Sequence, residues 1–183
     1  MVGELSIEGL DELRRQLNGL SRTAVPRASA QAVNRVASRA VSRSTARVAS
    51  ATKVPRRLVR GRVRLVKAST NMPTATLKVR RNNLPAIALG KASLRKPRGK
   101  SSAVLKVGPF TFPGAFIQQL ANGRWHVLRR TAKSRYPIEV VKIPMAIPLT
   151  EAYTDEVNKL METDMPKELS AALNNQMRIL YSR

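Results

Sequence analysis

Apolar residues at helical spacing mark the first third of the chain. Leucines recur every three or four residues from Leu10 to Leu20, and Gly19 is a typical C-terminal stop for such a helix. A second run, built on alanine and valine, predicts a helix from about Thr23, a residue suited to capping, to about Ser50. Its small side chains favour close packing against another element.

Alternation with a period of two replaces the helical pattern after this point. The run Lys53–Lys67 fits either a strand or a short helix followed by a strand, and the pattern leaves both open. Thr74–Arg80 alternates clearly, and Leu84–Leu89 is its predicted partner strand across a turn at Asn82-Asn83. Ala103–Val107 predicts a further strand.

A helical pattern returns at Thr150 and continues toward the C-terminus, with a kink or restart predicted at Asp164–Pro166. N-terminal helices, a mainly antiparallel β-sheet and C-terminal helices together predict an α+β fold. A length of 183 residues suits one domain, so we predict a single domain over residues 1–183. The stretch from about Lys91 to Ser102 is basic and has no apolar period, which predicts an exposed, flexible loop.

Large aromatic side chains gather between Pro109 and Leu149, which holds five of the seven in the chain. Asn122-Gly123 lies between two extended runs and predicts a β-hairpin. The run Tyr136–Ile143 is apolar on both faces and predicts a central strand. We therefore predict the core in this segment, with the following anchors: Phe112, Phe116, Trp125 and Tyr136.

The charge is strongly positive and unevenly distributed. The chain has 34 basic and 11 acidic residues, a net charge of +23. No carboxylate occurs between Glu12 and Glu139, and 29 of the basic residues lie in that gap. We expect the guanidinium groups there to lack an internal partner and to face a polyanion or an acidic partner outside the chain. A solubilising basic surface is the alternative interpretation.

Arginines at intervals of four form a ridge along the second predicted helix. Like charges at this spacing destabilise a helix, so a compensating contact is expected. The ridge fits either DNA or an acidic partner, or else a solvated helix face, and the pattern leaves both open. The candidate contacts for DNA or an acidic partner are Arg35, Arg39, Arg43, Arg47, Arg60, Arg62, Arg64, Lys91, Arg95, Lys96, Arg98 and Lys100.

Residues that would carry catalysis or bind a cofactor are scarce. The chain has no cysteine, which excludes disulfides and thiolate metal sites, and His126 is the only histidine. No P-loop or nucleophile-elbow motif occurs. Met1–Leu20 has no signal-peptide character, and no apolar run is long enough for a bilayer. We therefore predict a non-enzymatic, soluble protein made in a cytoplasm, with no cofactor, metal or membrane.

Several segments resemble a known family. The runs Phe112–Val127 and Arg135–Thr150 look like the minor tail protein Z family of lambda-like tailed phages. The segments Thr23–Ala28, Val33–Ser38 and Met165–Leu169 fit the same pattern, so the resemblance covers nearly the full chain. It is weakest in the basic loop.

The resemblance implies a virion protein that completes the head-proximal end of a long non-contractile tail and contributes to head–tail joining. Similar proteins assemble as rings, commonly hexameric. The implied partners are further copies of this chain, the tail terminator, the tail tube and the head–tail connector. Assembly would take place in the host cytoplasm, and DNA in the ring lumen would explain the basic charge. A free DNA-binding protein that uses the ridge and the basic loop is the alternative.

Overall fold

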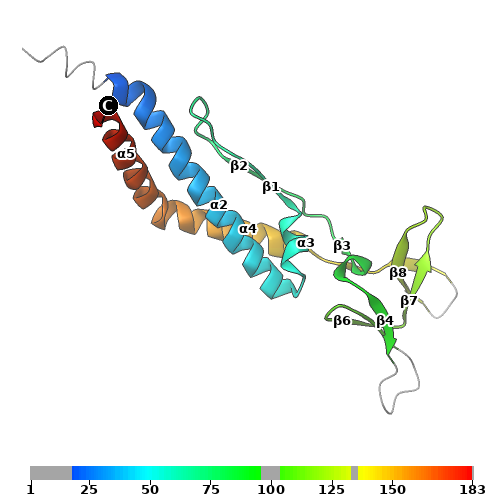
Figure 1. Ribbon diagram of the computed structural model, residues 1–183. Coiled ribbons are helices and arrows are strands. Elements are labelled where there is room, and N and C mark those ends of the chain that lie inside the picture. Colours follow the sequence, from blue (N-terminus) through cyan, green and yellow to red (C-terminus); the bar gives the residue numbers. More distant parts are fainter. Residues whose placement is uncertain (1–17, 96–103, 133–135, 183) are drawn as a thin grey trace, which may run out of the picture. The chain divides into compact units, whose positions relative to one another are not determined.

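A computed structural model describes residues 18–95, 104–132 and 136–182, which fall into two compact units (Figure 1). The helical unit comprises the chain up to Ser44, Val63–Val79, and the chain from Tyr153 onward. The strand unit comprises Thr45–Arg62 and Arg80–Ala152. Helices α2 (Val25–Thr52) and α4 (Ala146–Thr163) each contribute residues to both units.

The helical unit is built on small side chains that let two helices approach closely. Figure 1 shows α5 (Met165–Tyr181) alongside α2. Ala28 and Ala32 of α2 are fully buried against Ala172 of α5, and leucine and methionine side chains of α5 pack around them. The predicted helix over Thr23–Ser50 is confirmed, and its alanine face is the face that packs.

The start of this helix differs from the prediction. Leu20–Ala24 is a π-helical turn, η1, that leads directly into α2. Gly19 already has helical backbone angles, and the Thr23 hydroxyl donates to the Gly19 carbonyl oxygen at 2.6 Å. The predicted stop at Gly19 and cap at Thr23 are therefore wrong, because no helix terminus lies between them. The predicted helix from Leu10 lies mostly outside the described residues.

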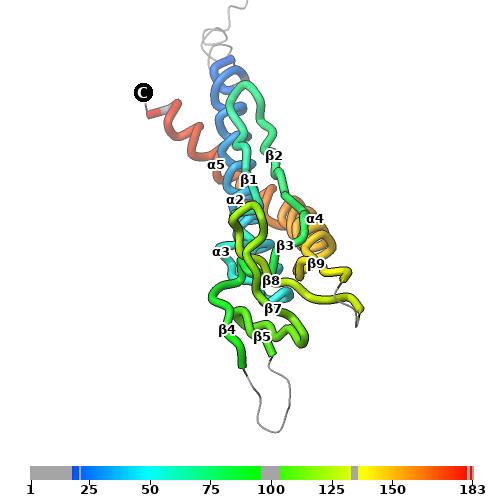
Figure 2. The backbone as a smooth tube through the Cα atoms, turned by 90° about the vertical axis from the view of Figure 1, so that its right-hand side faces the viewer, coloured from blue at the N-terminus to red at the C-terminus, as the bar shows by residue number. Residues whose placement is uncertain are grey.

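A β-hairpin completes the helical unit. Strands β1 (Val63–Val66) and β2 (Thr76–Val79) pair antiparallel, and Figure 2 shows them beside α2. The Asn34 side chain of α2 donates to the Ala68 carbonyl oxygen at 2.9 Å and accepts from the Ala68 amide at 2.8 Å. Leu77 of β2 packs on the buried cluster that Leu160 of α4 forms with α2.

This pairing settles one open question and corrects one prediction. Arg56–Arg60 forms the short helix α3, so Lys53–Lys67 is a short helix followed by a strand. The predicted partner of β2, Leu84–Leu89, is instead a two-residue strand β3 (Leu84–Pro85) followed by the 3₁₀ helix η2 (Ala86–Leu89). Proline has no amide hydrogen to donate, which limits the length of a paired strand there.

Short antiparallel strands form several small sheets in the strand unit. One sheet has the order β4-β5-β6, a second has β7-β8-β9, and β10 pairs with β3. The bounds are β4 Ala92–Arg95, β5 Val104–Val107, β6 Phe110–Pro113, β7 Ala115–Gln119, β8 Trp125–Arg130, β9 Ile138–Val140 and β10 Lys142–Ile143. The α+β prediction is confirmed, although the strands form several small sheets.

Of two predictions for the segment from Ala115 to Ile143, the hairpin is confirmed and the central strand is wrong. The hairpin at Asn122-Gly123 is confirmed as β7–β8, and Gly123 has a positive φ of 72°. The central strand over Tyr136–Ile143 is wrong, because it divides into β9, at the edge of its sheet, and β10 in another sheet. Between them the Val141 amide donates to the Val127 carbonyl oxygen, and its own carbonyl accepts from Ala86.

Aliphatic side chains, rather than aromatic ones, fill the core of the strand unit. Fully buried side chains there include Leu105, Val107, Val127, Met145 and Leu149. Among the predicted anchors, Trp125 is 56% exposed and Tyr136 is 65% exposed, so neither is a core residue. Trp125 is the first residue of β8, at the loop end of the strand, and pairs in register with Gln119.

The other aromatic anchors lie at the margin of the core. Phe112 is half-buried and stacks on Phe110, with ring centroids 6.2 Å apart. Phe116 is half-buried too, and the Arg130 guanidinium lies 6.0 Å from its ring centroid. Small sheets have little interior, so large rings remain at their edges.

Two further predictions concern the organisation of the chain. The basic loop begins later than predicted, because Ala92–Arg95 is strand β4; residues 96–103 lie outside the described part. The restart near Asp164 is confirmed, since α4 ends at Thr163 and α5 begins at Met165. That residues 1–183 act as one domain stays a prediction.

Candidate functional site

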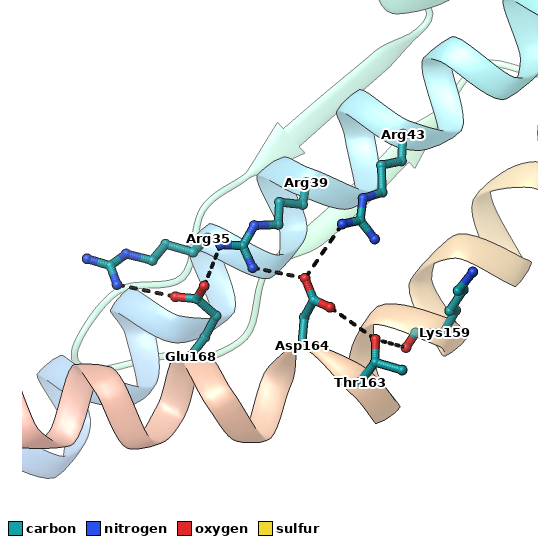
Figure 3. Close-up of polar contacts among 7 residues, drawn as sticks. All are labelled: Arg35, Arg39, Arg43, Lys159, Thr163, Asp164 and Glu168. Atoms are coloured by element: carbon teal, nitrogen blue, oxygen red, sulfur yellow. Dashed lines mark hydrogen bonds and ion pairs between the residues drawn. The ribbon is translucent and has the colours of Figure 1, made fainter.

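The arginine ridge of α2 faces two carboxylates of the C-terminal helices (Figure 3). Glu168 accepts from Arg35 at 3.2 Å and from Arg39 at 2.5 Å. Asp164 accepts from Arg39 at 2.9 Å and lies 3.9 Å from Arg43. The spacing of four residues along α2 matches the four residues that separate Asp164 from Glu168, so the two rows face each other in register.

These contacts shift the pKa of the paired groups. Hydrogen bonds from Arg39 and then Arg35 hold the pKa of Glu168 below its ordinary value. A hydrogen bond from Thr163, followed by one from Arg39, lowers the pKa of Asp164. Bonds to Glu168 and then to Asp164 raise the pKa of Arg39. Both carboxylates are therefore ionised at neutral pH and joined to the ridge.

The expectation that these guanidinium groups lack an internal partner is wrong for Arg35, Arg39 and Arg43. Their partners lie more than a hundred residues away in the sequence, beyond the acid-free region. The side chains of the two carboxylates are 13% and 21% exposed, while those of the arginines are about half exposed. The network closes one side of the ridge and leaves the other side in solvent.

A second ion pair lies in the strand unit. Arg129 of β8 and Glu139 of β9 are opposite each other in the strand register, and their side chains meet at 2.9 Å. Both side chains are about half exposed, so this pair contributes little to stability.

The remaining candidate contacts are distributed over several elements. Arg60 is exposed on α3, Arg64 is exposed on β1, and Lys91 and Arg95 are exposed at the two ends of the β4 segment. Arg47 lies in the part of α2 that belongs to the strand unit. The other candidates lie outside the described residues: Lys96, Arg98 and Lys100.

Arg62 is the candidate that the structure places in a pocket. The pocket has a volume of about 390 Å³, and every lining residue belongs to the strand unit: Arg57, Leu58, Gly61, Arg62, Arg80, Asn82 and Leu84. Arg62 Nη1 donates to the Arg80 carbonyl oxygen at 3.3 Å and to the Asn82 carbonyl oxygen. Arg80 Nη2 donates to the Gly61 carbonyl oxygen at 3.3 Å.

The sequence interpretation missed four residues of these sites. The sequence pattern indicated Asp164 only as part of a helix restart and gave Glu168 no role of its own, although their spacing of four equals that of the ridge. Arg57 and Arg80 were passed over because neither belongs to a regular charge pattern. Their convergence depends on the turn between α3 and β1 and on the pairing of β1 with β2.

Neither a cluster of metal-ligating side chains nor a membrane-spanning helix is found among the described residues. No group of three or more histidine or acidic side chains there could hold a metal ion. Within the same ranges, no helix is long and apolar enough to cross a bilayer. His126, on β8, is half-buried, and its Nδ1 atom has no hydrogen-bond partner in the described part of the chain.

Comparison with known proteins gives concordant matches over almost the whole chain. The model of the prophage minor tail protein Z family matches residues 7–183. The tail completion protein of Escherichia phage N15 is 59% identical, and the alignment covers 98% of this chain and 100% of that protein. The tail completion protein Z of Escherichia phage lambda is 47% identical, with coverage of 98% and 100%. No solved structure gives a significant match.

Both relatives are named as tail completion proteins, and the family match spans both compact units. The resemblance inferred from the sequence motifs is thereby confirmed. The chain belongs to the prophage minor tail protein Z family, a family of phage tail proteins.

Proposed function

We propose that this chain completes the head-proximal end of a long non-contractile phage tail and contributes to joining that tail to the head. The observation that carries the proposal is the full-length match to two tail completion proteins, at 59% and 47% identity. The tail terminator, the tail tube and the head–tail connector are the proposed partners. In this role the protein acts by binding its neighbours, in the virion and during assembly in the host cytoplasm.

The proposed assembly is a ring of identical copies, most simply a hexamer, around the path of the DNA. The net charge of +23 supports this, because a ring that surrounds DNA places basic surface next to phosphate groups. Repeated copies in a closed ring also require two different contact surfaces on each copy.

Deletion of the reading frame in its phage tests the role in joining. We expect heads and tails to form separately and the titre of infectious particles to fall, with recovery when the chain is supplied in trans. Electron microscopy of the lysate distinguishes unjoined tails from absent tails. Infectious particles that contain no copy of the chain by mass spectrometry would disprove the role.

The stoichiometry is tested on intact particles. Averaged images of the tail end should show additional density in several symmetry-related copies, and quantitative mass spectrometry should count about as many copies as the images show. A single copy per particle would disprove the ring.

A free DNA-binding protein is the second candidate, favoured only by the net charge. Asp164 and Glu168 pair with three arginines of the ridge, which leaves fewer guanidinium donors there to bind DNA phosphates. An isolated chain that used 6–10 phosphate contacts would lose about 10³–10⁵ in affinity between 50 and 200 mM salt. Such binding, together with absence from particles, would favour this candidate over the tail role.

A further inference from the structure

We infer that the pocket formed by Arg57, Arg62 and Arg80 is a site for one phosphate group of the DNA backbone. This inference rests on the proposed tail role only for the identity of the DNA, which would be the phage genome in the tail-end path. The site contains none of the ridge arginines of α2, and all its lining residues belong to the strand unit.

The first support is the balance of charge within the pocket. Three of its seven lining residues are arginines, and none of the seven is acidic. Burial and then the positive charge of Arg80 lower the pKa of Arg62, although an arginine stays protonated at neutral pH. The pocket thus holds repelling positive charges that a bound anion would stabilise.

The second support is the way the guanidinium groups are held. Arg62 and Arg80 are bonded to backbone carbonyl oxygens of each other's segments, which orients both groups while leaving their charges uncompensated. A guanidinium has five N–H donors, and these bonds use only Nη1 of Arg62 and Nη2 of Arg80. Donors on the other nitrogens remain for a ligand, and the exposed residue Arg57 also lines the pocket.

The same residue type behaves differently in the ridge. There, Arg35, Arg39 and Arg43 meet carboxylates of the same chain, so an incoming anion would have to compete with Asp164 and Glu168. In the pocket no lining residue is acidic, so an anion would meet the carbonyl-bonded guanidinium groups of Arg62 and Arg80 together with that of Arg57. Arginine binds phosphate through paired N–H donors, and several arginines from different directions suit its tetrahedral oxygens better than a planar carboxylate.

Binding of the full chain to a labelled DNA duplex of arbitrary sequence, at several salt concentrations, tests the site. We expect Arg57→Gln to weaken binding about threefold to tenfold and to reduce the salt slope by about one, as for the loss of one phosphate contact. Arg124→Gln removes the same charge from the exposed β7–β8 loop and should change affinity less than twofold. Arg80→Gln should behave like Arg57→Gln, with circular dichroism as the check on folding.

Equal affinities and salt slopes for Arg57→Gln, Arg124→Gln and the unmodified chain would overturn the inference. Arg57 makes this test robust, because its side chain is exposed and its loss does not disturb the core. A polyglutamate peptide offers a second comparison. If the peptide displaces the duplex and binds more tightly than it, and if this binding is lost in Arg57→Gln and Arg80→Gln, the inference is overturned in favour of an acidic protein partner.

The outcome is separable from that of the proposed function. If Arg57→Gln leaves DNA binding unchanged while deletion of the chain still yields unjoined tails, the site fails and the tail role stands. If deletion does not affect particles while Arg57→Gln weakens DNA binding, the tail role fails and the phosphate site stands.

Discussion

The two compact units differ in what their arginines bond to and in the features that shape each unit. In the helical unit, a row of arginines on α2 meets a row of carboxylates on the C-terminal helices, and alanines beneath allow the helices to approach. In the strand unit, Arg62 and Arg80 bond to carbonyl oxygens, and the four glycines that have a positive φ among the described residues lie in its turns. Helix packing therefore holds the first unit, and turn geometry holds the second. The ridge arginines of the helical unit thus meet carboxylates, whereas Arg62 and Arg80 of the strand unit meet only carbonyl oxygens in the bonds described.

The largest expected effect tests whether the units lose stability separately. Leu160→Ala removes a fully buried side chain that packs on Val36 and Ala40, which should cost about 2–5 kcal/mol of unfolding free energy. Hydrogen exchange followed by mass spectrometry should show faster exchange in α2, α5 and the β1–β2 hairpin.

The neighbouring Met161 is half exposed, so Met161→Ala is the control and should change stability by no more than about 0.5 kcal/mol. Leu105→Ala, in the strand unit, should produce the reverse pattern of exchange. Equal loss of protection in both units from either substitution would show one cooperative body and remove the contrast.

A smaller effect tests the importance of turn geometry. Gly108→Ala forces alanine into a left-handed conformation (φ 56°) and places its Cβ 3.1 Å from the Leu89 carbonyl oxygen, which should destabilise the strand unit by about 1–2 kcal/mol. Gly114 has a similar φ of 68° with open space around a Cβ, so Gly114→Ala measures the cost of the left-handed backbone conformation without a close contact. The free energy of unfolding measured with urea should be lower for Gly108→Ala than for Gly114→Ala. The opposite order would contradict the proposed contact with Leu89.

The ion network should contribute less than core packing because its arginines are largely in solvent. Glu168→Gln removes the partner of Arg35 and Arg39 and should lower the melting temperature by less than Leu160→Ala does. The matched control is Glu162→Gln, since Glu162 is exposed on α4 and makes no ion pair among the described residues. Indistinguishable melting temperatures for the two variants would show that the network adds no stability.

The same network predicts a direction of pH dependence. The pKa values of Asp164 and Glu168 are lower in the folded chain, so their stabilisation is complete above the unfolded values of about 4. It is lost as the pH falls below that range and through the folded values. Melting curves between pH 7 and pH 2.5 should show a larger acid-induced decrease for the unmodified chain than for a variant carrying Asp164→Asn and Glu168→Gln. Parallel decreases would refute the coupling.

The smallest effect concerns an aromatic residue outside the core. Trp125→Ser should change stability by about 0.5 kcal/mol or less, because the side chain is 56% exposed. Val127→Ala, two residues along the same strand, should cost clearly more, since Val127 is fully buried. A loss for Trp125→Ser as large as that for Val127→Ala would contradict the exposed position.

Local patterns predicted the elements better than their partners. The long helix of α2, the restart at Asp164 and the hairpin at Asn122-Gly123 follow from residues within a few positions of one another. The pairing of β2 with β1, rather than with Leu84–Leu89, depends on which strand reaches the α2 surface. Neither a propensity nor a spacing within the strand carries that information.

The sequence identified which basic residues to consider for the candidate site, but it did not identify the residues that pair with them. The acid-free region identified basic residues, including Arg62, as the ones to examine, because charge is additive along the sequence. It gave no indication that Arg35, Arg39 and Arg43 meet carboxylates more than a hundred residues away, since ion pairs depend on distances in space. Aromatic content likewise overstated the core, as Trp125 and Tyr136 are exposed.

By itself, the sequence determined the family, the α+β class and the excess of positive charge, each of which depends on residue identity and short-range order. Tertiary structure alone decided which positive charges are neutralised and which converge. Asp164 and Glu168 reach the ridge only because α5 lies along α2, and Arg57, Arg62 and Arg80 share a pocket only because the chain turns between α3 and β1. Electrostatic energy depends on distance, and folding sets those distances.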